Sequence, residues 1–315
     1  MGRPDFSGQR VGPYLLTNIL GRGSAGTVYR AVGLHSNGAS SYAIKCLPKK
    51  GISRQRGYQL ATEIFILDTV VGSPHVLALR DIIEEDLHFF LVFDLCEMDL
   101  YTAIQQKQVY WRNDPLIKKA FIQIVDGVIA CHEQGIFHRD LKPDNILCRA
   151  DGTGIQIGDF GLATYNRFCR NGCGTPRYMS PGQSVVPTYI LIELTGLECW
   201  TSDKRNPYDA RQMDIWALGI ILFNMVTGCS AWEAALPSEK GFKAFIDDEE
   251  YLFYSSSISE PLSALLKWIL HPVPSERLSL AAIRQIVLEI DTFYKWRGPP
   301  PGLSPLSKEV ALVDS

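Results

Sequence analysis

The sequence predicts an α+β protein of two lobes, in which a small β-rich lobe precedes a larger, mainly helical lobe. β-Forming residues dominate positions 14–93, and one helical stretch interrupts them. After Cys96 the apolar residues recur at helical spacing instead. A chain of 315 residues is long for one core and suits two lobes. We therefore expect a cleft between the lobes, which is a common place for a ligand.

The first lobe, residues 13–96, is expected to hold a five-stranded sheet and one helix. The helix is predicted within 57–71, where Leu60, Ile64 and Leu67 share one face. The strand candidates are short runs rich in β-branched and aromatic residues, at 14–20, 27–32, 41–47, 75–83 and 87–95.

The second lobe, residues 97–290, is expected to be mainly helical. Its first long helix is predicted at 115–135, where Gly135 is a typical stop. Further helices are predicted at 211–228, 260–270 and 278–290. Outside the two lobes, residues 1–12 read as a flexible lead-in and residues 291–315 as a Pro-rich disordered tail.

Composition excludes several classes of protein. The net charge of −3 gives no basic field, so we expect no nucleic-acid or anionic-membrane binding. The longest apolar run, 215–228, is too short to cross a bilayer and predicts a buried helix. The N-terminus has no apolar signal region, and the eight cysteines follow no regular frame. We expect free thiols, no zinc site, and a cytoplasmic or nuclear protein.

A glycine-rich turn, "GRGSAGTVY", lies between the first two strand candidates. Gly21, Gly23 and Gly26 would allow backbone N–H groups to approach phosphate oxygens. Alone the signal is weak, because an ordinary turn explains it equally well. The flanking strands argue against a dinucleotide-binding turn, which opens a helix, and no Gly-Lys-Ser/Thr follows as in a Walker loop.

Lys45 is a single cation on the apolar strand "YAIKC". It is either an edge lysine that points to water or an inward lysine that needs a carboxylate or phosphate partner. Glu63, on the predicted helix, is the nearest downstream candidate for that partner.

Two further segments place carboxylates in loops, "HRDLKPDN" and "GDFG". Asp140 is suited to accept a proton from a hydroxyl, and Asn145 to offer an oxygen to a hard cation. Lys142 would stabilise negative charge between Asp140 and Asn145. Asp159 supplies another carboxylate beside the flexible Gly161.

In order and spacing these segments resemble the catalytic core of the eukaryotic protein kinases, from about residue 14 to residue 290. The pair Lys142-Pro143 is similar to the Ser/Thr kinases. The stretches "CGTPRYMSP" and "RQMDIWALGIILFNMVTG" resemble the fungal kinases that include negative regulators of meiosis. The resemblance implies a bilobal kinase fold and transfer of a phosphoryl group from ATP, with Mg²⁺, to Ser/Thr hydroxyls of protein substrates, by a monomer.

The resemblance also implies roles for individual residues. Asp140 would accept the proton of the substrate hydroxyl, with Lys142 near the transferred group. Lys45 would contact the α- and β-phosphates and pair with Glu63, and Asp159 and Asn145 would hold Mg²⁺. The implied nucleotide-binding positions are Gly21, Gly23, Gly26, Val28, Ala43 and Lys45, the hinge residues Asp94 and Cys96, with Phe93 as gatekeeper, and Asp99 at the ribose.

The resemblance leaves rival functions open. One is a kinase-fold scaffold that binds nucleotide but transfers poorly, and another is a small-molecule phosphotransferase, which the peptide-docking residues disfavour. His138 and Asp214 are expected to be structural. Between Tyr165 and Thr175 there is no Ser, Thr or Tyr. Arg139 could bind a phosphorylated residue of this segment, but without an acceptor there we predict that activation-loop phosphorylation is not required.

One stretch departs from the family pattern. Gly182 follows Ser180-Pro181 where a Glu belongs, and "EC" appears only at Glu198-Cys199. Removing residues 182–197 gives "YMSPECW" and restores the pattern. These 16 residues correspond to 48 bases, so a retained intron is one hypothesis and a genuine insertion the other. In either case we expect a damaged docking surface, because the Glu that should pair with Arg277 is displaced, and a nearly intact ATP site.

Overall fold

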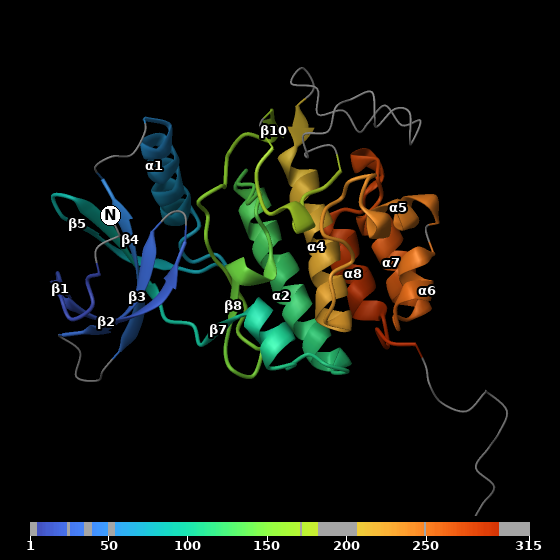
Figure 1. Cartoon of the computed structure of the whole chain (residues 1–315), viewed down its shortest axis with the longest axis horizontal. Coiled ribbons are helices and arrows are strands. Elements are labelled where there is room, and N and C mark those ends of the chain that lie inside the picture. The colour runs from blue at the N-terminus through green and yellow to red at the C-terminus, as the bar shows by residue number, and fades with distance from the viewer. Residues whose placement is uncertain are drawn as a thin grey trace, which may run out of the picture.

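The computed structural model describes residues 5–23, 26–34, 40–49, 54–170, 172–181, 207–248 and 250–295. These residues form two lobes (Figure 1), with the main sheet and one helix in the first and the remaining helices in the second. The predicted bilobal α+β fold is therefore confirmed. No described helix has the length and apolar character needed to cross a membrane.

The first lobe is built on an antiparallel sheet with the strand order β1-β2-β3-β4-β6-β5. The five predicted strands are present, and the two-residue β1 lies at the edge beside β2. The strands are β1 (Arg10–Val11), β2 (Tyr14–Arg22), β3 (Thr27–Gly33), β4 (Ser41–Pro48), β5 (Leu79–Glu84) and β6 (His88–Asp94).

The strand predicted to begin at residue 75 begins at Leu79 instead. Residues before it turn to the second lobe, where the Leu77 N–H donates to the Ile157 carbonyl at 2.9 Å. Val76 also forms a parallel bridge with Ile157. The apolar residues 76 and 77 are thus buried against the other lobe, which explains why they resemble a strand in sequence.

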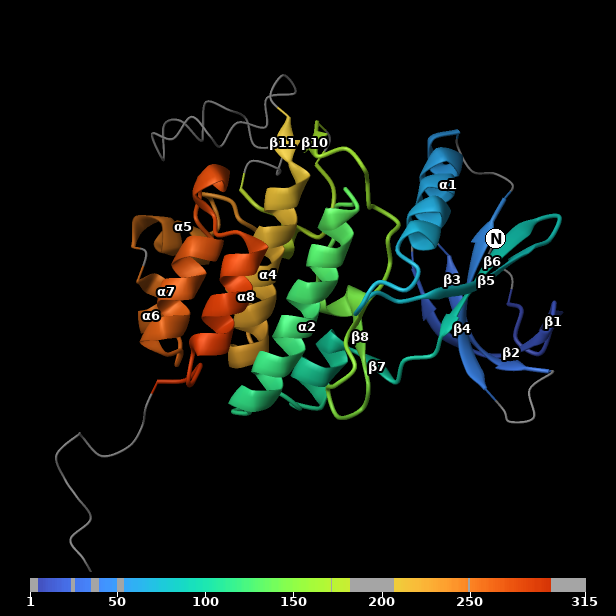
Figure 2. The same ribbon diagram turned by 180° about the vertical axis from the view of Figure 1, so that it is seen from behind.

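Helix α1 (Arg54–Thr69) lies beside the sheet, as seen from behind in Figure 2. Its inner face buries Leu60, Ile66 and Leu67, each less than 8% exposed. Glu63 lies on the same side and is only 3% exposed. The helix therefore carries one carboxylate inward among apolar side chains, a placement that needs a cationic partner.

The second lobe is organised around α4 (Ala210–Thr227). Its residues from Met213 to Val226 are all buried, so the helix is apolar on every side and forms the centre of the lobe. Gly228 ends it with φ +69°, a left-handed conformation that favours glycine. The other helices are α2 (Asp114–Glu133), α5 (Lys240–Asp247), α6 (Tyr251–Ser255), α7 (Glu260–Ile269) and α8 (Leu280–Glu289), with a π-helical turn at Thr102–Gln106.

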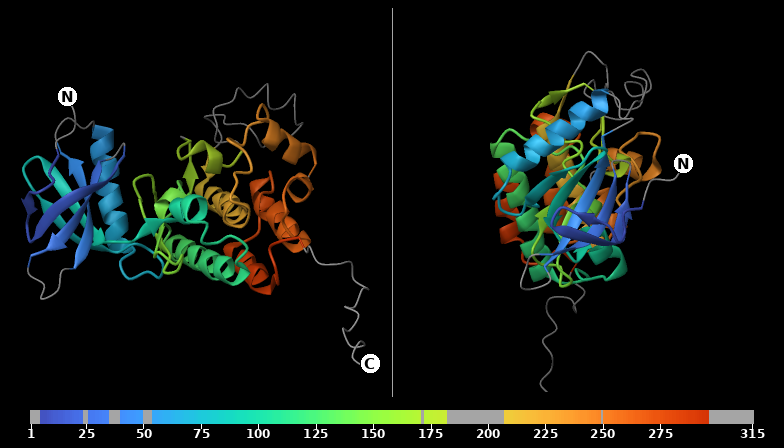
Figure 3. Two further views of the ribbon diagram at one scale, coloured as in Figure 1. Left: turned by 60° about the horizontal axis from the view of Figure 1, so that its bottom comes forward. Right: turned by 90° about the vertical axis from the view of Figure 1, so that its left-hand side faces the viewer.

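Short strands position the loops between the lobes (Figure 3). β7 (Met98–Asp99), β8 (Ile146–Cys148) and β9 (Gln156–Ile157) form one small sheet. β10 (Phe168–Cys169) and β11 (Tyr208–Asp209) form another. One apolar core runs through both lobes and includes Leu60 and Phe93 of the first lobe and Phe160 of the second.

Candidate active site

Lys45 lies at the junction of the lobes and bridges two carboxylates. Its Nζ lies 2.6 Å from Glu63 Oε1 on α1 and 2.8 Å from Asp159 Oδ1 in the loop after β9. The Lys45 and Glu63 side chains are 12% and 3% exposed, whereas the Asp159 side chain is 50% exposed. Lys45 is thus the inward lysine of the two readings, and Asp159 offers an open carboxylate edge to a ligand.

The cluster keeps its groups charged despite burial. Burial lowers the pKa of Lys45, but Glu63 and Asp159 raise it more, and the net pKa lies above the usual value. Burial likewise raises the pKa of Asp159, but Lys45, with Lys142 nearby, brings the net pKa below its usual value of 3.8. At neutral pH this arrangement presents an ammonium and a carboxylate side by side.

Asp140 is held from two sides in the loop after α2. Its Oδ1 accepts from the Thr175 N–H at 2.9 Å and from the Thr175 hydroxyl at 2.8 Å. Lys142 Nζ lies 3.0 Å from Asp140 Oδ2 and donates to Thr175 Oγ1 at 2.9 Å. Thr175 therefore bonds both Asp140 and Lys142, and the carboxylate stands in a defined orientation.

Asn145 completes this loop in a 3-10 turn at Pro143–Asn145. Its Nδ2 donates to the Asp140 carbonyl at 2.9 Å, so its Oδ1 faces the other way. No hydrogen bond to that oxygen is found among the described residues. Asn145 Oδ1 and the Asp159 carboxylate are hard oxygen donors that suit Mg²⁺, which usually completes its shell with water and phosphate oxygens.

Asp214 on α4 supports the backbone of the same loop. Its Oδ2 accepts from the His138 N–H and its Oδ1 from the Arg139 N–H, each at 2.8 Å. His132 Nε2 also lies 2.9 Å from Asp214 Oδ2. At 1% exposure, Asp214 touches no open surface and acts structurally.

His138 has both ring nitrogens engaged. Nε2 lies 2.9 Å from the Gly158 carbonyl, and the Asp140 N–H donates to Nδ1 at 3.3 Å. This pattern fits the neutral tautomer with the proton on Nε2, assigned from its partners. With 2% exposure, His138 joins two loops structurally.

The glycine-rich turn connects β2 and β3 of the first lobe. A Cβ on Gly26 would lie 2.2 Å from the Cys46 carbonyl oxygen, so only glycine fits there. Gly21 and Gly23 have open space where a Cβ would point. The Gly23 N–H donates to the Gly26 carbonyl at 2.9 Å and closes the turn. Residues 24 and 25 lie outside the described residues.

The segment after β6 joins the lobes and carries the predicted hinge. Asp94 pairs with Arg80, with Nε to Oδ1 at 2.9 Å, so its side chain fixes β5 and β6. Cys96 is half-buried, and burial raises the pKa of its thiol to about 11. Asp99 accepts from the Thr102 N–H at 2.6 Å and thus caps the following π-helical turn. This cap is a structural use that the sequence did not suggest for Asp99.

The predicted adenine-side residues lie on adjacent strands. Val28 of β3 pairs with Lys45 of β4, and Ala43 pairs with Phe93 of β6. Phe93 is 8% exposed and belongs to the core, whereas Val28 and Ala43 are half-buried. The arrangement places these residues around Lys45.

Residues 182–206 lie outside the described residues, and with them the departure at 182–197 and Glu198, so the predicted loss of the Glu198–Arg277 ion pair stays a prediction. Arg277 is 6% exposed. It donates to the carbonyls of His271 and Gln212, each at 2.8 Å, and its guanidinium carbon lies 4.9 Å from the Trp216 ring centroid.

Two supporting residues were missed from sequence. Tyr208 of β11 contacts Arg139, with Arg139 Nη2 donating to its hydroxyl at 2.9 Å. His132, on α2, pairs with Asp214 as described above. Both contacts link segments about 70 to 80 positions apart in the sequence. Neither residue forms part of a local motif that would reveal them.

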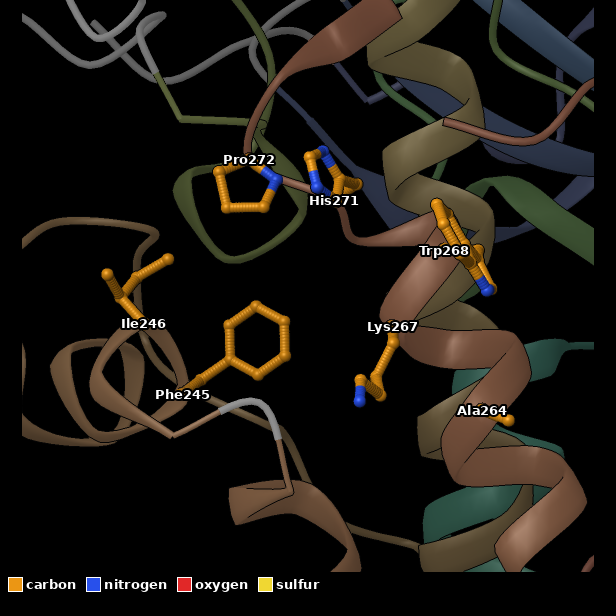
Figure 4. A pocket seen from close by; sticks show the side chains of 7 residues that line it. All are labelled: Phe245, Ile246, Ala264, Lys267, Trp268, His271 and Pro272. Atoms are coloured by element: carbon orange, nitrogen blue, oxygen red, sulfur yellow. The ribbon is translucent and has the colours of Figure 1, made fainter. Parts of the chain in front are cut away.

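A separate cavity of about 250 Å³ lies between α5 and α7 (Figure 4). Phe245 and Ile246 line one side, Lys267 and Trp268 of α7 line the other, and Pro272 lies at the top of the view. Lys267 pairs with Glu250 at 3.0 Å. None of the candidate site residues lines this cavity, so it is distinct from the active site.

The chain matches the protein kinase domain family over residues 14–288. It is 31% identical over 305 residues to "Negative regulator of sexual conjugation and meiosis" of Schizosaccharomyces pombe, covering 94% of this chain and 64% of that protein. It is 31% identical to "Serine/threonine-protein kinase ksp1" of the same yeast, covering 90% of this chain and 57% of that protein. It is 27% identical to "Serine/threonine-protein kinase VHS1" of Saccharomyces cerevisiae, covering 97% of this chain and 76% of that protein. The chain thus spans less than two thirds of the first two relatives.

Proposed function

The chain belongs to the protein kinase family, of the serine/threonine type that its fungal relatives represent, and on this premise we propose that it transfers the γ-phosphoryl group of Mg-ATP to Ser/Thr hydroxyls of protein substrates. The observation that carries the proposal is the convergence of Lys45, Glu63 and Asp159 beside a fixed Asp140. Phosphoryl transfer needs mainly positioning and charge stabilisation, which these groups supply.

The nucleotide is proposed to bind between the lobes. Gly21, Gly23 and Gly26 would cover its phosphates with backbone N–H groups, and Lys45 would neutralise the α- and β-phosphates. The base would lie on Val28 and Ala43, with the backbone of Asp94 and Cys96 as hydrogen-bond partners. Asp99 is proposed to bind the ribose. Its Oδ1 accepts from the Thr102 N–H, so the ribose hydroxyl would bond to Oδ2.

The chemical step is proposed to run through Asp140. The substrate hydroxyl oxygen forms a bond to the γ-phosphorus while the bond from that phosphorus to the β,γ-bridging oxygen breaks, and ADP leaves. Asp140 orients the hydroxyl and accepts its proton, while Lys142 lies 3.0 Å from Asp140 and offsets negative charge on the transferred group. Mg²⁺ held by Asn145 and Asp159 would supply further neutralisation of the phosphate oxygens.

The remaining proposals concern the whole chain. We assign the kinase domain to residues 13–290 and propose a monomer that acts on protein substrates in the cytoplasm or nucleus. The described cysteines are free, as expected in a reducing compartment. The absence of Ser, Thr and Tyr between Tyr165 and Thr175 supports activity without activation-loop phosphorylation.

The test is transfer of the γ-phosphoryl group from Mg-ATP to a generic basic protein, comparing the chain with Asp140→Asn. We expect the substitution to lower kcat by about 10²- to 10⁴-fold, the usual contribution of a general base, with nucleotide affinity unchanged. Asp126→Asn is the matched control, because Asp126 pairs with Arg284 at the surface of the helical lobe, away from the site. Equal activity of the two variants would refute the role of Asp140.

A further inference from the structure

Arg139 occupies a strained position directly before Asp140. Its φ of +67° lies in the left-handed region, which a non-glycine residue keeps only with support from its surroundings. Its backbone N–H donates to Asp214 Oδ1 at 2.8 Å, which holds the main chain from the α4 side. The orientation of the next residue, Asp140, depends on how firmly this conformation is kept.

The side chain of Arg139 is held by Tyr208. Arg139 Nε and Nη2 both donate to the Tyr208 hydroxyl, at 3.2 and 2.9 Å. The guanidinium carbon also lies 6.0 Å from the Tyr208 ring centroid. Two N–H groups of one rigid fork thus converge on a single oxygen, which restricts the direction of the side chain.

Tyr208 is itself fixed by the elements around it. In the β10–β11 pair, Cys169 lies opposite Tyr208 and Phe168 opposite Asp209. The Ala210 N–H donates to the Arg167 carbonyl at 2.7 Å, and Arg167 Nη2 lies 2.8 Å from Asp209 Oδ2. Tyr208 packs on the small cluster of Phe137, Cys169 and Ala210. It is therefore tied both to the segment that follows Asp159 and to the start of α4.

The Tyr208 hydroxyl remains protonated at physiological pH. Burial raises its pKa well above the usual value, although Arg139 opposes this shift. The hydroxyl therefore accepts from Arg139 as a neutral phenol. This contact joins β11, at the start of α4, to the loop that carries Asp140.

We propose that Tyr208 is a positioning residue for the transfer reaction: its hydroxyl fixes Arg139 and thereby the orientation of the Asp140 carboxylate. The inference rests on the proposed function. Without the hydroxyl, two hydrogen bonds to Arg139 disappear, and the strained backbone before Asp140 loses this part of its support. Lys45 and Asp159 do not contact Tyr208, so the effect is specific to the chemical step and spares nucleotide binding.

The test compares Tyr208→Phe with Tyr110→Phe. Tyr110 is buried, and its hydroxyl donates to the Gly152 carbonyl at 2.6 Å, away from the site, so each variant loses one hydroxyl from a tyrosine in the helical lobe. We expect Tyr208→Phe to lower kcat by about tenfold or more, because small misplacements of a catalytic group are costly, with KM for ATP unchanged. Tyr110→Phe should leave both constants unchanged.

A second readout does not depend on catalysis. Hydrogen exchange is followed at the Arg139 and Thr175 amides, which donate to Asp214 and Asp140. Tyr208→Phe should accelerate exchange at both amides, whereas Tyr110→Phe should not. If the wild-type chain transferred no phosphoryl group, the proposed function would fail while the exchange data still decided the role of Tyr208. Unchanged exchange, or a kcat equal to that of Tyr110→Phe, overturns the inference.

Discussion

At the scale of single residues, Lys45 is stabilised as an ammonium by two opposing carboxylates. Burial by itself lowers the pKa of Lys45, because it penalises the charged form. Glu63 and Asp159 reverse this effect and raise the pKa of Lys45. The same interaction lowers the pKa of Asp159, so the two shifts are mutually consistent. A charged cluster of this kind is ready to receive phosphates without first taking up or releasing a proton.

The lowered pKa of Asp159 predicts how stability depends on pH. A carboxyl whose pKa is lower in the folded protein adds stability above its unfolded pKa, and that contribution is lost as the pH falls through the folded pKa. With the unfolded value near 3.8, the contribution of Asp159 should be complete above about pH 5 and lost progressively below about pH 4.

Urea unfolding of the wild type and of Asp159→Asn from pH 3 to pH 7 measures this effect. The difference in unfolding free energy between the two proteins should be constant between about pH 5 and pH 7 and should change only on the acid side. A difference that varied between pH 5 and pH 7 would show that the folded pKa is raised.

The positions of individual site residues were predictable from the sequence where a local motif carried them, and their chemical roles stay predictions. The spacing in "HRDLKPDN" and "GDFG" located Asp140, Asn145 and Asp159. The residues alone left Lys45 open between an edge lysine and an inward one, and the resemblance to the kinases implied its pairing with Glu63. Tyr208 was not predictable in this way, because its role depends on a tertiary contact with Arg139, 69 positions away.

At the scale of elements, periodicity identified the long helices and missed the short ones. The apolar spacing predicted α2, α4, α7 and α8 close to their observed bounds. α5 and α6 have only 8 and 5 residues, too few for a helical period to be distinguished from a loop. The two-residue strands β7 and β9 to β11 were missed because pairing, and not a residue pattern, defines them.

The glycine-rich turn allows an element-scale prediction with an internal control. Gly26→Ala should destabilise the first lobe by about 1–3 kcal/mol, because its Cβ would lie 2.2 Å from the Cys46 carbonyl oxygen on β4. Gly21→Ala meets no atom within 4 Å and should change stability by less than about 0.5 kcal/mol. Thermal unfolding of both variants measures the contrast. Equal effects would mean that β3 and β4 do not approach each other as described.

At the scale of the whole molecule, the candidate site depends on the contact between the lobes. Lys45 and Glu63 belong to the first lobe, whereas Asp159 and Asp140 belong to the second. The contact of residues 76 and 77 with Ile157 joins the lobes a second time. The sequence predicted both lobes but not this contact, because an apolar pair has the same sequence pattern whether it lies in a sheet or against a neighbouring lobe.

Residues 182–197 provide the last prediction. They interrupt the family pattern between Pro181 and Glu198, in the segment that the resemblance to the kinases assigns to substrate docking. The contacts of Lys45 and Asp140 described above are made without them. A chain lacking residues 182–197 should therefore bind nucleotide as the full chain does, but phosphorylate a basic protein at least about tenfold faster, since accurate docking of the hydroxyl controls transfer.

The measurement compares transfer of the γ-phosphoryl group by both chains, with Asp159→Asn in each as the blank. Faster transfer by the shortened chain would show that residues 182–197 interfere with substrate docking, which agrees with a retained intron. Equal rates would show that the insertion is tolerated and that the docking argument is wrong. If both chains bound nucleotide without transfer above the blank, the scaffold function would replace the enzyme. Tyr208 pairs with β10 and bonds Arg139, so we expect the loop that carries Asp140 to be intact in both chains. We therefore expect the chains to differ in docking, with faster transfer by the shortened chain.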